Sequence, residues 1–301
     1  MIALSTSAFY EQANRQIGSL RSQAETLQQQ VGSGNRLTHS SDDPVAAARL
    51  RALDRADRLS QIDQRSADKA GADLQLTDSA LGSIADIIAR AQELALSAAS
   101  GTLSTDQRTA IGSELEGMQQ SLLVVANARD SAGHALFGGQ TAGAAYGLAG
   151  GTFTYQGTDT VAPLDLGEGQ SVTPALTGPE VLAFNQAGQP GDLFAVLGTL
   201  AAAMATDTAP DAARSALDGL GAALDKVTTA QAVVGSRIGL VELLNERRTD
   251  QAELSGSERD SVGGADLATS ITRLQQVMTV LEASQASFVR LSSLSLFQML
   301  R

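Results

Sequence analysis

Apolar residues at the two ends of the chain recur at alternating steps of three and four. The first row consists of Ala13, Ile17, Leu20, Ala24, Leu27 and Val31. The second row consists of Leu267, Ile271, Leu274, Met278, Leu281 and Phe288. A repeat of about 3.5 residues on a helix makes a narrow apolar seam that needs a partner helix. The rows therefore predict two terminal helices that pair along these seams.

The segments inside these ends have the pattern of long helices. Asp43 followed by Pro44 predicts a helix start, because a carboxylate caps free N–H groups and proline fits the first turn. Gly101 predicts the end of that helix, and Ser104 with Gln107 predicts a capping box for the next. Apolar stripes continue along three segments: Leu74, Leu81, Ile84, Ile88, Ala91, Ala95 and Ala98; then Ile111, Leu115, Met118, Leu122 and Val125; then Leu217, Leu220, Leu224, Val227, Val234, Ile238 and Val241. Such stripes predict a helical bundle with an Ala/Leu/Val core.

The middle of the chain differs in composition from its surroundings. Between Asp130 and Ala213 there is no Lys or Arg, and most of the aromatic residues fall in this window. Short runs bounded by glycine and other turn residues predict strands at 152–155, 161–166 and 171–176. An amphipathic pattern from Leu193 to Met204 predicts one helix that closes the insertion.

Together these patterns predict a mainly α protein: a long, coiled-coil-like helical bundle built from both chain ends, with a small β-rich insertion in the middle. We expect three nested parts, with 1–43 plus 263–301 as terminal paired helices, 44–135 plus 206–262 as the helical bundle, and 136–205 as the β-rich outer domain. Glycines at 32, 34, 263 and 264 predict breaks between the terminal helices and the bundle. Asp266 is predicted to cap the C-terminal helix.

Composition narrows the possible partners. The chain of 301 residues has a formal net charge of −12, which argues against a nucleic acid or an anionic membrane surface. No uninterrupted apolar run approaches the roughly 20 residues that span a bilayer, so we expect no membrane insertion. There is no Cys, and residues 1–7 lack the basic and apolar regions of a Sec-type signal peptide. These features are typical of a protein that stays inside the cell or leaves by another route.

Residues that could suggest enzyme chemistry have simpler interpretations. The glycine-rich segment 138–143 has no following Lys to reach phosphates. His39 and His134 are the only histidines, and no further imidazole or thiolate completes a metal set. Asp42 and Asp43 precede Pro44, so helix capping explains them better than acid–base chemistry. We therefore predict no catalytic residues, no metal, no cofactor and no enzymatic activity.

Several short motifs carry a resemblance to a known family. They are Gly32–Leu37 (GSGNRL), Ser41–Ala48 (SDDPVAAA), Asn127–Asp130 (NARD), Leu136–Gly139 (LFGG) and the C-terminal Leu294–Arg301 (LSLFQMLR). With them the chain resembles, over roughly residues 1–140 and 210–301, the bacterial flagellar hook-associated proteins of the hook–filament junction, a flagellin-like family. Pro44 and the C-terminal Ser-Leu-Phe favour this family over flagellin itself.

The resemblance implies a structural protein of the bacterial flagellum, secreted by the flagellar type III route and located outside the cell at the hook–filament junction. It would assemble through the terminal seams into a ring or layer with copies of itself, between flagellin and the hook-side hook-associated protein. It also implies a cytosolic export chaperone at the C-terminal segment, where Leu291, Leu294, Phe297 and Leu300 are the candidate contacts. Two alternatives stay open: a compact flagellin that forms the filament itself, or an adhesin-type binding module in the insertion.

Overall fold

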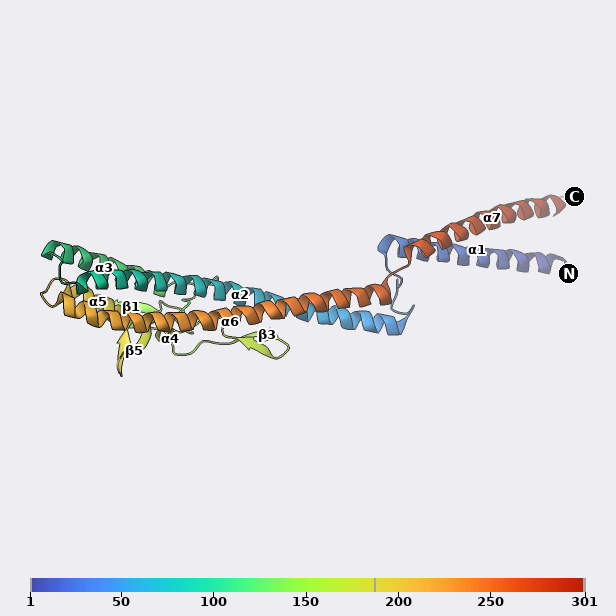
Figure 1. Ribbon diagram of the computed structural model, residues 1–301. Coiled ribbons are helices and arrows are strands. Elements are labelled where there is room, and N and C mark those ends of the chain that lie inside the picture. Colours follow the sequence, from blue (N-terminus) through green and yellow to red (C-terminus); the bar gives the residue numbers. More distant parts are fainter. Residues whose placement is uncertain (1, 187, 300–301) are drawn as a thin grey trace. The chain divides into compact units, whose positions relative to one another are not determined.

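The computed structural model describes residues 2–186 and 188–299, and most of them are helical (Figure 1). The helices are α1 (Ile2–Ser33), α2 (Pro44–Ala99), α3 (Thr105–Ala126), α4 (Gly178–Leu182), α5 (Leu193–Ala203), α6 (Ala209–Gly263) and α7 (Leu267–Met299). The chain divides into two compact units. One consists of Met1–Leu59 with Asp250–Arg301, and the other is Ser60–Thr249. The first unit thus combines the two ends of the sequence, and the second is its continuous middle.

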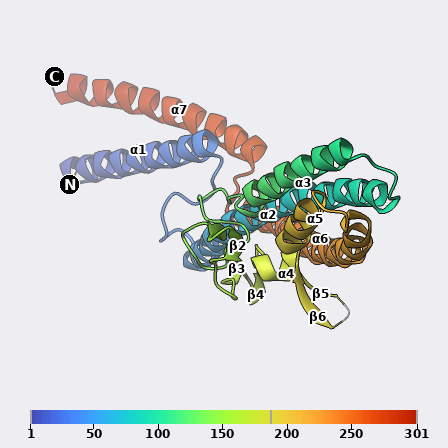
Figure 2. The ribbon, with the colours of Figure 1, turned by 90° about the vertical axis from the view of Figure 1, so that its left-hand side faces the viewer.

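The second unit is a helical bundle whose core follows the predicted stripes. Its fully buried side chains include Leu74, Leu81, Ile84 and Ile88 of α2, Leu115 and Leu122 of α3, and Leu220, Val227 and Val234 of α6. Helices α3 and α5 lie side by side (Figure 2). A Cβ on Gly112 would lie 3.3 Å from the Ala201 carbonyl oxygen, so the absence of a side chain permits this close packing. The predicted helical-bundle fold is confirmed, whereas its predicted bounds, 44–135 plus 206–262, stay a prediction.

The predicted helix boundaries are confirmed where a capping signal marks them. The Ser104 amide donates to Gln107 Oε1 at 2.9 Å, and the Gln107 amide donates to Ser104 Oγ at 3.3 Å. These reciprocal bonds form the predicted capping box of α3. Asp192 caps α5 by accepting from the Phe194 amide at 2.8 Å, and α2 begins at Pro44 as expected.

The insertion contains three separate antiparallel hairpins rather than one sheet. They pair β1 (Tyr146–Ala149) with β2 (Thr152–Tyr155), β3 (Leu164–Gly167) with β4 (Gln170–Val172), and β5 (Ala183–Gln186) with β6 (Gln189–Asp192). The predicted strand at 152–155 is confirmed. The strands predicted at 161–166 and 171–176 are shorter and shifted toward each other, because the turn lies at Glu168–Gly169. Strands β1, β5 and β6 were not expected.

Aromatic residues form the core of the insertion. The rings of Phe153 and Phe194 stack with centroids 4.7 Å apart, and Tyr146 lies 5.2 Å from Phe194 and 5.3 Å from Tyr155. Tyr146 and Phe194 are buried. Burial also raises the pKa of the Tyr146 hydroxyl. Phe153 and Tyr155 are partly buried, so the four rings pack against one another in the interior of the insertion.

One helix is apolar enough, by length and composition, to be compared with a membrane span. Within α6 an 18-residue window reaches a mean hydropathy of 1.2, and 28% of that window is buried. Core helices of water-soluble proteins pass the same test, and α6 contributes Leu220 and Val227 to the bundle core. The expectation of no membrane insertion therefore stays a prediction.

Candidate assembly interface

The terminal helices α1 and α7 lie side by side in the first unit (Figure 1). On α1, the side shielded from solvent is the predicted apolar row. Ala24 is 5% exposed, and the row's other members are partly buried, namely Ala13, Ile17, Leu20, Leu27 and Val31. Small alanines in this row allow a close approach between the two helices. The pair therefore forms within a single chain.

On α7, the predicted row is partly wrong as the surface that faces α1. Leu274, Leu281 and Phe288 are shielded, but the residues between them that share this protection are Ser270, Val277 and Ser284. Leu267, Ile271 and Met278 are 46%, 43% and 37% exposed. The seam is thus rotated by about one residue, or roughly 100° at these intermediate positions. Shorter side chains face α1, which permits a closer approach between the backbones.

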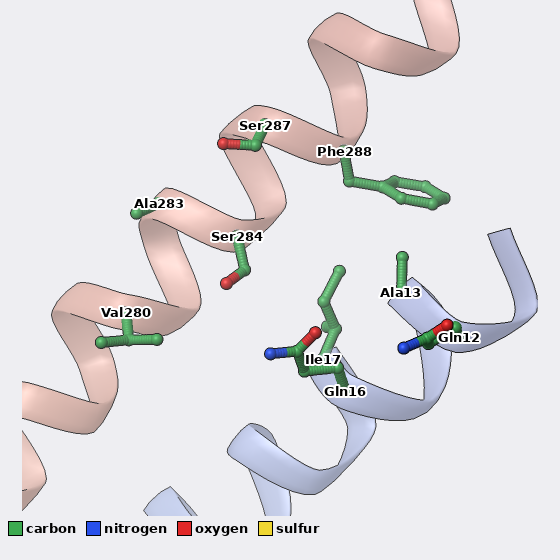
Figure 3. A pocket seen from close by; sticks show the side chains of 9 residues that line it. All are labelled: Gln12, Ala13, Gln16, Ile17, Val280, Ala283, Ser284, Ser287 and Phe288. Carbon is green, nitrogen blue, oxygen red and sulfur yellow. The ribbon is translucent and has the colours of Figure 1, made fainter. Parts of the chain in front are cut away.

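An aromatic contact and a groove mark one end of the described helix pair. The rings of Tyr10 and Phe288 meet edge to face, with centroids 5.5 Å apart at 88°. Beside them is a groove of about 430 Å³, which Figure 3 shows between the facing surfaces of the two helices. Its walls are Gln12, Ala13, Gln16 and Ile17 of α1 and Val280, Ala283, Ser284, Ser287 and Phe288 of α7. The small residues leave this space between the helices open.

A short bridge of backbone hydrogen bonds joins the segments that follow α1 and precede α7. The Arg36 amide donates to the Gly263 carbonyl at 2.7 Å, and the Ala265 amide donates to the Gly34 carbonyl at 2.8 Å. Gly34 has a φ of 72°, a conformation that glycine adopts without strain. The two predicted glycine-rich breaks therefore bind each other, which the separate sequence signals did not reveal. We call residues 34–36 and 263–265 the joint.

Arg36 ties the joint to the start of α2. Its guanidinium donates to the Val262 carbonyl at 3.0 Å and to the Asp43 carboxylate at 3.3 Å. Asp43 also accepts from the Ala46 amide at 3.0 Å, which confirms its predicted capping role. That amide and the Arg36 guanidinium lower the pKa of the Asp43 carboxyl. One carboxylate thus connects helix α2 to the joint.

Two more carboxylates support the turns on either side of the joint. Asp42 accepts from the His39 amide at 2.8 Å and from the Thr38 hydroxyl at 3.0 Å, and these donors lower its pKa. Asp266 accepts from the Thr269 hydroxyl at 2.7 Å and the Thr269 amide at 3.1 Å, which lowers its pKa in turn. Asp266 therefore caps α7 as predicted.

Ion pairs connect the beginning of α2 with the end of α6. Arg49 Nη2 donates to Glu258 Oε2 at 2.7 Å, and this pair raises the pKa of Arg49 and lowers that of Glu258. Arg259 donates to Asp54 at 3.1 Å and also contacts Asp57. Each exposed pair stabilises little alone, but together they fix two antiparallel helices in one register.

For the predicted chaperone contacts on the C-terminal segment, the structure describes at most the backbone. Leu291, Leu294 and Phe297 lie on the backbone of α7, and their side chains are not described; Leu300 lies outside the described residues. Among residues 2–186 and 188–299, no group of three or more His, Cys, Asp or Glu side chains is placed to hold a metal ion. The chaperone contacts therefore stay a prediction.

Comparison with known proteins gives this fold a family context. Residues 4–142 match the bacterial flagellin N-terminal helical region. Over 98% of its length the chain is 28% identical to flagellar hook-associated protein 3 of Escherichia coli K12, of which 98% is covered. FlgL of Xanthomonas campestris superposes with a TM-score of 0.63 at 18% identity, over 69% of this chain and 99% of that one. The flagellar junction protein FlgL of Legionella pneumophila gives 0.61 at 14%, over 71% and 99%.

The sequence similarities relate the chain to flagellin-like structural proteins of the bacterial flagellum, and the solved structures share its fold. Among these proteins the chain resembles flagellar hook-associated protein 3 along nearly its whole length. The resemblance seen in its short motifs is thereby confirmed.

Proposed function

We propose that this protein forms the junction layer between the hook-side hook-associated protein and the flagellin filament, outside the cell. The single observation that supports this best is the similarity to hook-associated protein 3 from end to end, which includes both terminal helices. In this proposal the protein reaches its place by the flagellar type III route.

The described surface of α7 offers a means of assembly. Leu267, Ile271, Met278 and Val289 lie on one side of the helix, next to the side that faces α1, and all are exposed. An exposed apolar row on a helix is a surface for another helix. We propose that this row contacts terminal helices of neighbouring subunits, whereas Leu274, Leu281 and Phe288 hold α1 and α7 together. The interface predicted from the sequence then has two parts with different tasks.

We further propose that a cytosolic chaperone binds the C-terminal segment before export. The segment 291–300 is rich in Leu, Phe and Met, and an apolar segment of this kind invites aggregation unless a partner covers it. Leu291, Leu294 and Phe297 follow at steps of three, so one groove can receive them together. Binding of a truncated chain that lacks 266–301 measures this directly, and undiminished chaperone binding would place the contact elsewhere.

A deletion strain examined by electron microscopy tests the junction role. Without the protein we expect hooks that carry no filament and flagellin released into the medium, and the full-length gene should restore filaments. Immunogold labelling should mark one short band at the hook tip. Labelling along the whole filament, or long filaments grown from the purified protein alone, would instead identify a flagellin. Filaments of normal length in the deletion strain would contradict both the junction role and the flagellin role.

A further inference from the structure

Basic side chains form a row along the outer side of α2. The row consists of Arg51, Arg55, Arg58, Arg65 and Lys69, and Ile62 fills the step between Arg58 and Arg65. All are exposed. Arg51 Nε donates to the Ala47 carbonyl of its own helix at 3.1 Å. Within the described chain the other four cations make no hydrogen bond or ion pair. We call this set the basic row.

Acidic side chains form a corresponding row along α6. It consists of Glu242, Glu246, Asp250, Glu253 and Asp260, with Ser257 at the intervening step, and all of these residues are exposed. None of the five carboxylates has a partner among the described residues. We call this set the acidic row. The two rows have the same number of charges and nearly the same length.

Within the first unit, the contacts between α2 and α6 place the rows on opposite outer sides of this helix pair. Leu53, Asp54 and Asp57 of α2 and Ser255 and Arg259 of α6 are on the facing sides. At 100° per residue, Arg51, Arg55 and Arg58 lie on average about 120° around α2 from its facing side. Asp250, Glu253 and Asp260 lie about 160° around α6 from its facing side. Neither row can therefore reach the other inside one molecule.

The same contacts place both rows at one level along the helices. Arg49 pairs with Glu258, and Arg259 contacts Asp57. Because the helices are antiparallel, later residues of α2 lie opposite earlier residues of α6. Arg55 is accordingly level with residues between about 252 and 261 of α6, a stretch that contains Glu253 and Asp260. A second molecule beside the first, in the same orientation, would bring its acidic row against the first molecule's basic row.

Like charges at steps of three and four repel each other, so each row alone destabilises its helix slightly. An opposite row relieves that repulsion, sets register and excludes the reversed orientation. We infer that the basic row of one copy docks on the acidic row of α6 in the next copy. The contact joins two different surfaces, so it propagates head to tail into a ring or helix. It rests on the proposed function only in requiring that copies assemble side by side.

Cysteine cross-linking tests this contact without background, because the chain contains no Cys. The full-length chain with Arg55→Cys and Glu253→Cys replaces the natural copy, and isolated flagella are oxidised. We expect a ladder of covalent multiples of the 31.0 kDa chain. Each single-Cys chain should give no ladder, because a head-to-tail contact never brings the same residue of two copies together.

The outcomes separate this inference from the proposed function. Swimming cells that give no ladder from the double-Cys chain would refute the contact between rows and leave the junction role intact. A cross-linked dimer from Arg55→Cys alone would show a two-fold contact, and a product of another mass would show a different partner; each overturns the inference. Failure of the unmodified gene to restore swimming in the deletion strain would instead remove the proposed function.

Charge reversal gives an independent measurement. Arg55→Glu should reduce incorporation at the hook tip, and adding Glu253→Arg in the same chain should restore it, because every contact again joins opposite charges. Arg247→Glu is the matched control: Arg247 is exposed on α6, has no partner among described residues and lies off both rows. Equal losses for Arg55→Glu and Arg247→Glu, or no rescue, would contradict the inference.

Discussion

Gly264 shows how one residue controls the joint. A Cβ at this position would lie 2.4 Å from the Asp260 carbonyl oxygen, to which the Gly264 amide donates. The backbone must shift to accept Gly264→Ala, which separates the Ala265 amide from Gly34. We expect faster hydrogen exchange of the Arg36 and Ala265 amides. The matched control is Gly256→Ala within α6, where nothing lies within 4 Å of the added Cβ. Helix propensity should raise the free energy of unfolding there by about 1 kcal/mol.

The carboxylates near the joint predict its response to acid. The pKa values of Asp42, Asp43 and Asp266 are lowered by donors that bind the ionised form. A carboxyl group whose pKa is lower in the folded than in the unfolded protein stabilises the fold at pH values above its ordinary pKa. That stabilisation is lost as the pH falls through the pKa of the folded state. Acidification below about pH 4 should therefore open the joint.

Hydrogen exchange of residues 34–46 as a function of pH measures this opening. Asp43→Asn should remove part of the pH dependence, since the amide cannot supply a charge for Arg36. Burial raises the pKa of Asp192 in the insertion, so acid should leave that helix cap intact and provide an internal control. Equal acid sensitivity of the α5 cap and the joint would contradict this account.

At the scale of elements, the rotated seam of α7 shows the limit of a heptad pattern. Leu274, Leu281 and Phe288 belong to two possible rows, one completed by Ile271 and Met278 and the other by Ser270, Val277 and Ser284. The sequence favours the more apolar row. The structure selects the row with smaller side chains, because Ala13 and Ala24 on α1 allow the helices to approach closely. The hydrophobic pattern of one helix alone does not predict the distance at which its partner helix packs.

The two faces of α7 predict different consequences for one type of substitution. Leu281→Asp places a charge against α1, where only 7% of the leucine is exposed, and should separate the terminal helices. Met278→Asp lies on the exposed row and should leave the pair intact while it prevents docking of neighbours. Hydrogen exchange of α1 should increase only for Leu281→Asp, and both variants should lose incorporation at the hook tip. If Met278→Asp assembles normally, the exposed row is not an interface.

The hairpins of the insertion were hard to predict for a different reason. Strands β5 and β6 contain Asn, Pro, Gly and Asp, which disfavour strands on their own. Phe184 is buried, and a Cβ on its cross-strand partner Gly191 would lie 2.8 Å from its ring, so this close pair holds the hairpin together. Packing overrides local propensity here. Thr152–Tyr155, which is rich in β-forming residues, was predictable.

For the whole molecule, the fold class and the family resemblance could be predicted because periodicity and short motifs are local signals. The joint and the ion pairs could not, since Arg36 and Val262, or Arg49 and Glu258, lie more than 200 positions apart. Nothing near Arg49 indicates that its partner is Glu258 rather than another of the many acids. The charge rows belong between these cases: each is visible in the sequence, but only the register of α2 with α6 places them on opposite sides.

The difference in burial between the terminal helix pair and the bundle predicts how the isolated monomer responds to protease. Among side chains with described burial, only Ala24 of α1 and Leu281 of α7 are fully buried, whereas the bundle has a continuous core. A helix pair with so little buried surface opens readily, because helix propensity alone is marginal in water. Trypsin should first cut at Arg15, Arg21, Arg273 and Arg290 and leave a core near 44–262. Mass spectrometry identifies the fragments, with Arg90 and Arg214 of the bundle as internal controls. Cleavage at these two sites before the terminal ones would show that the terminal pair is the more stable unit, contrary to this prediction.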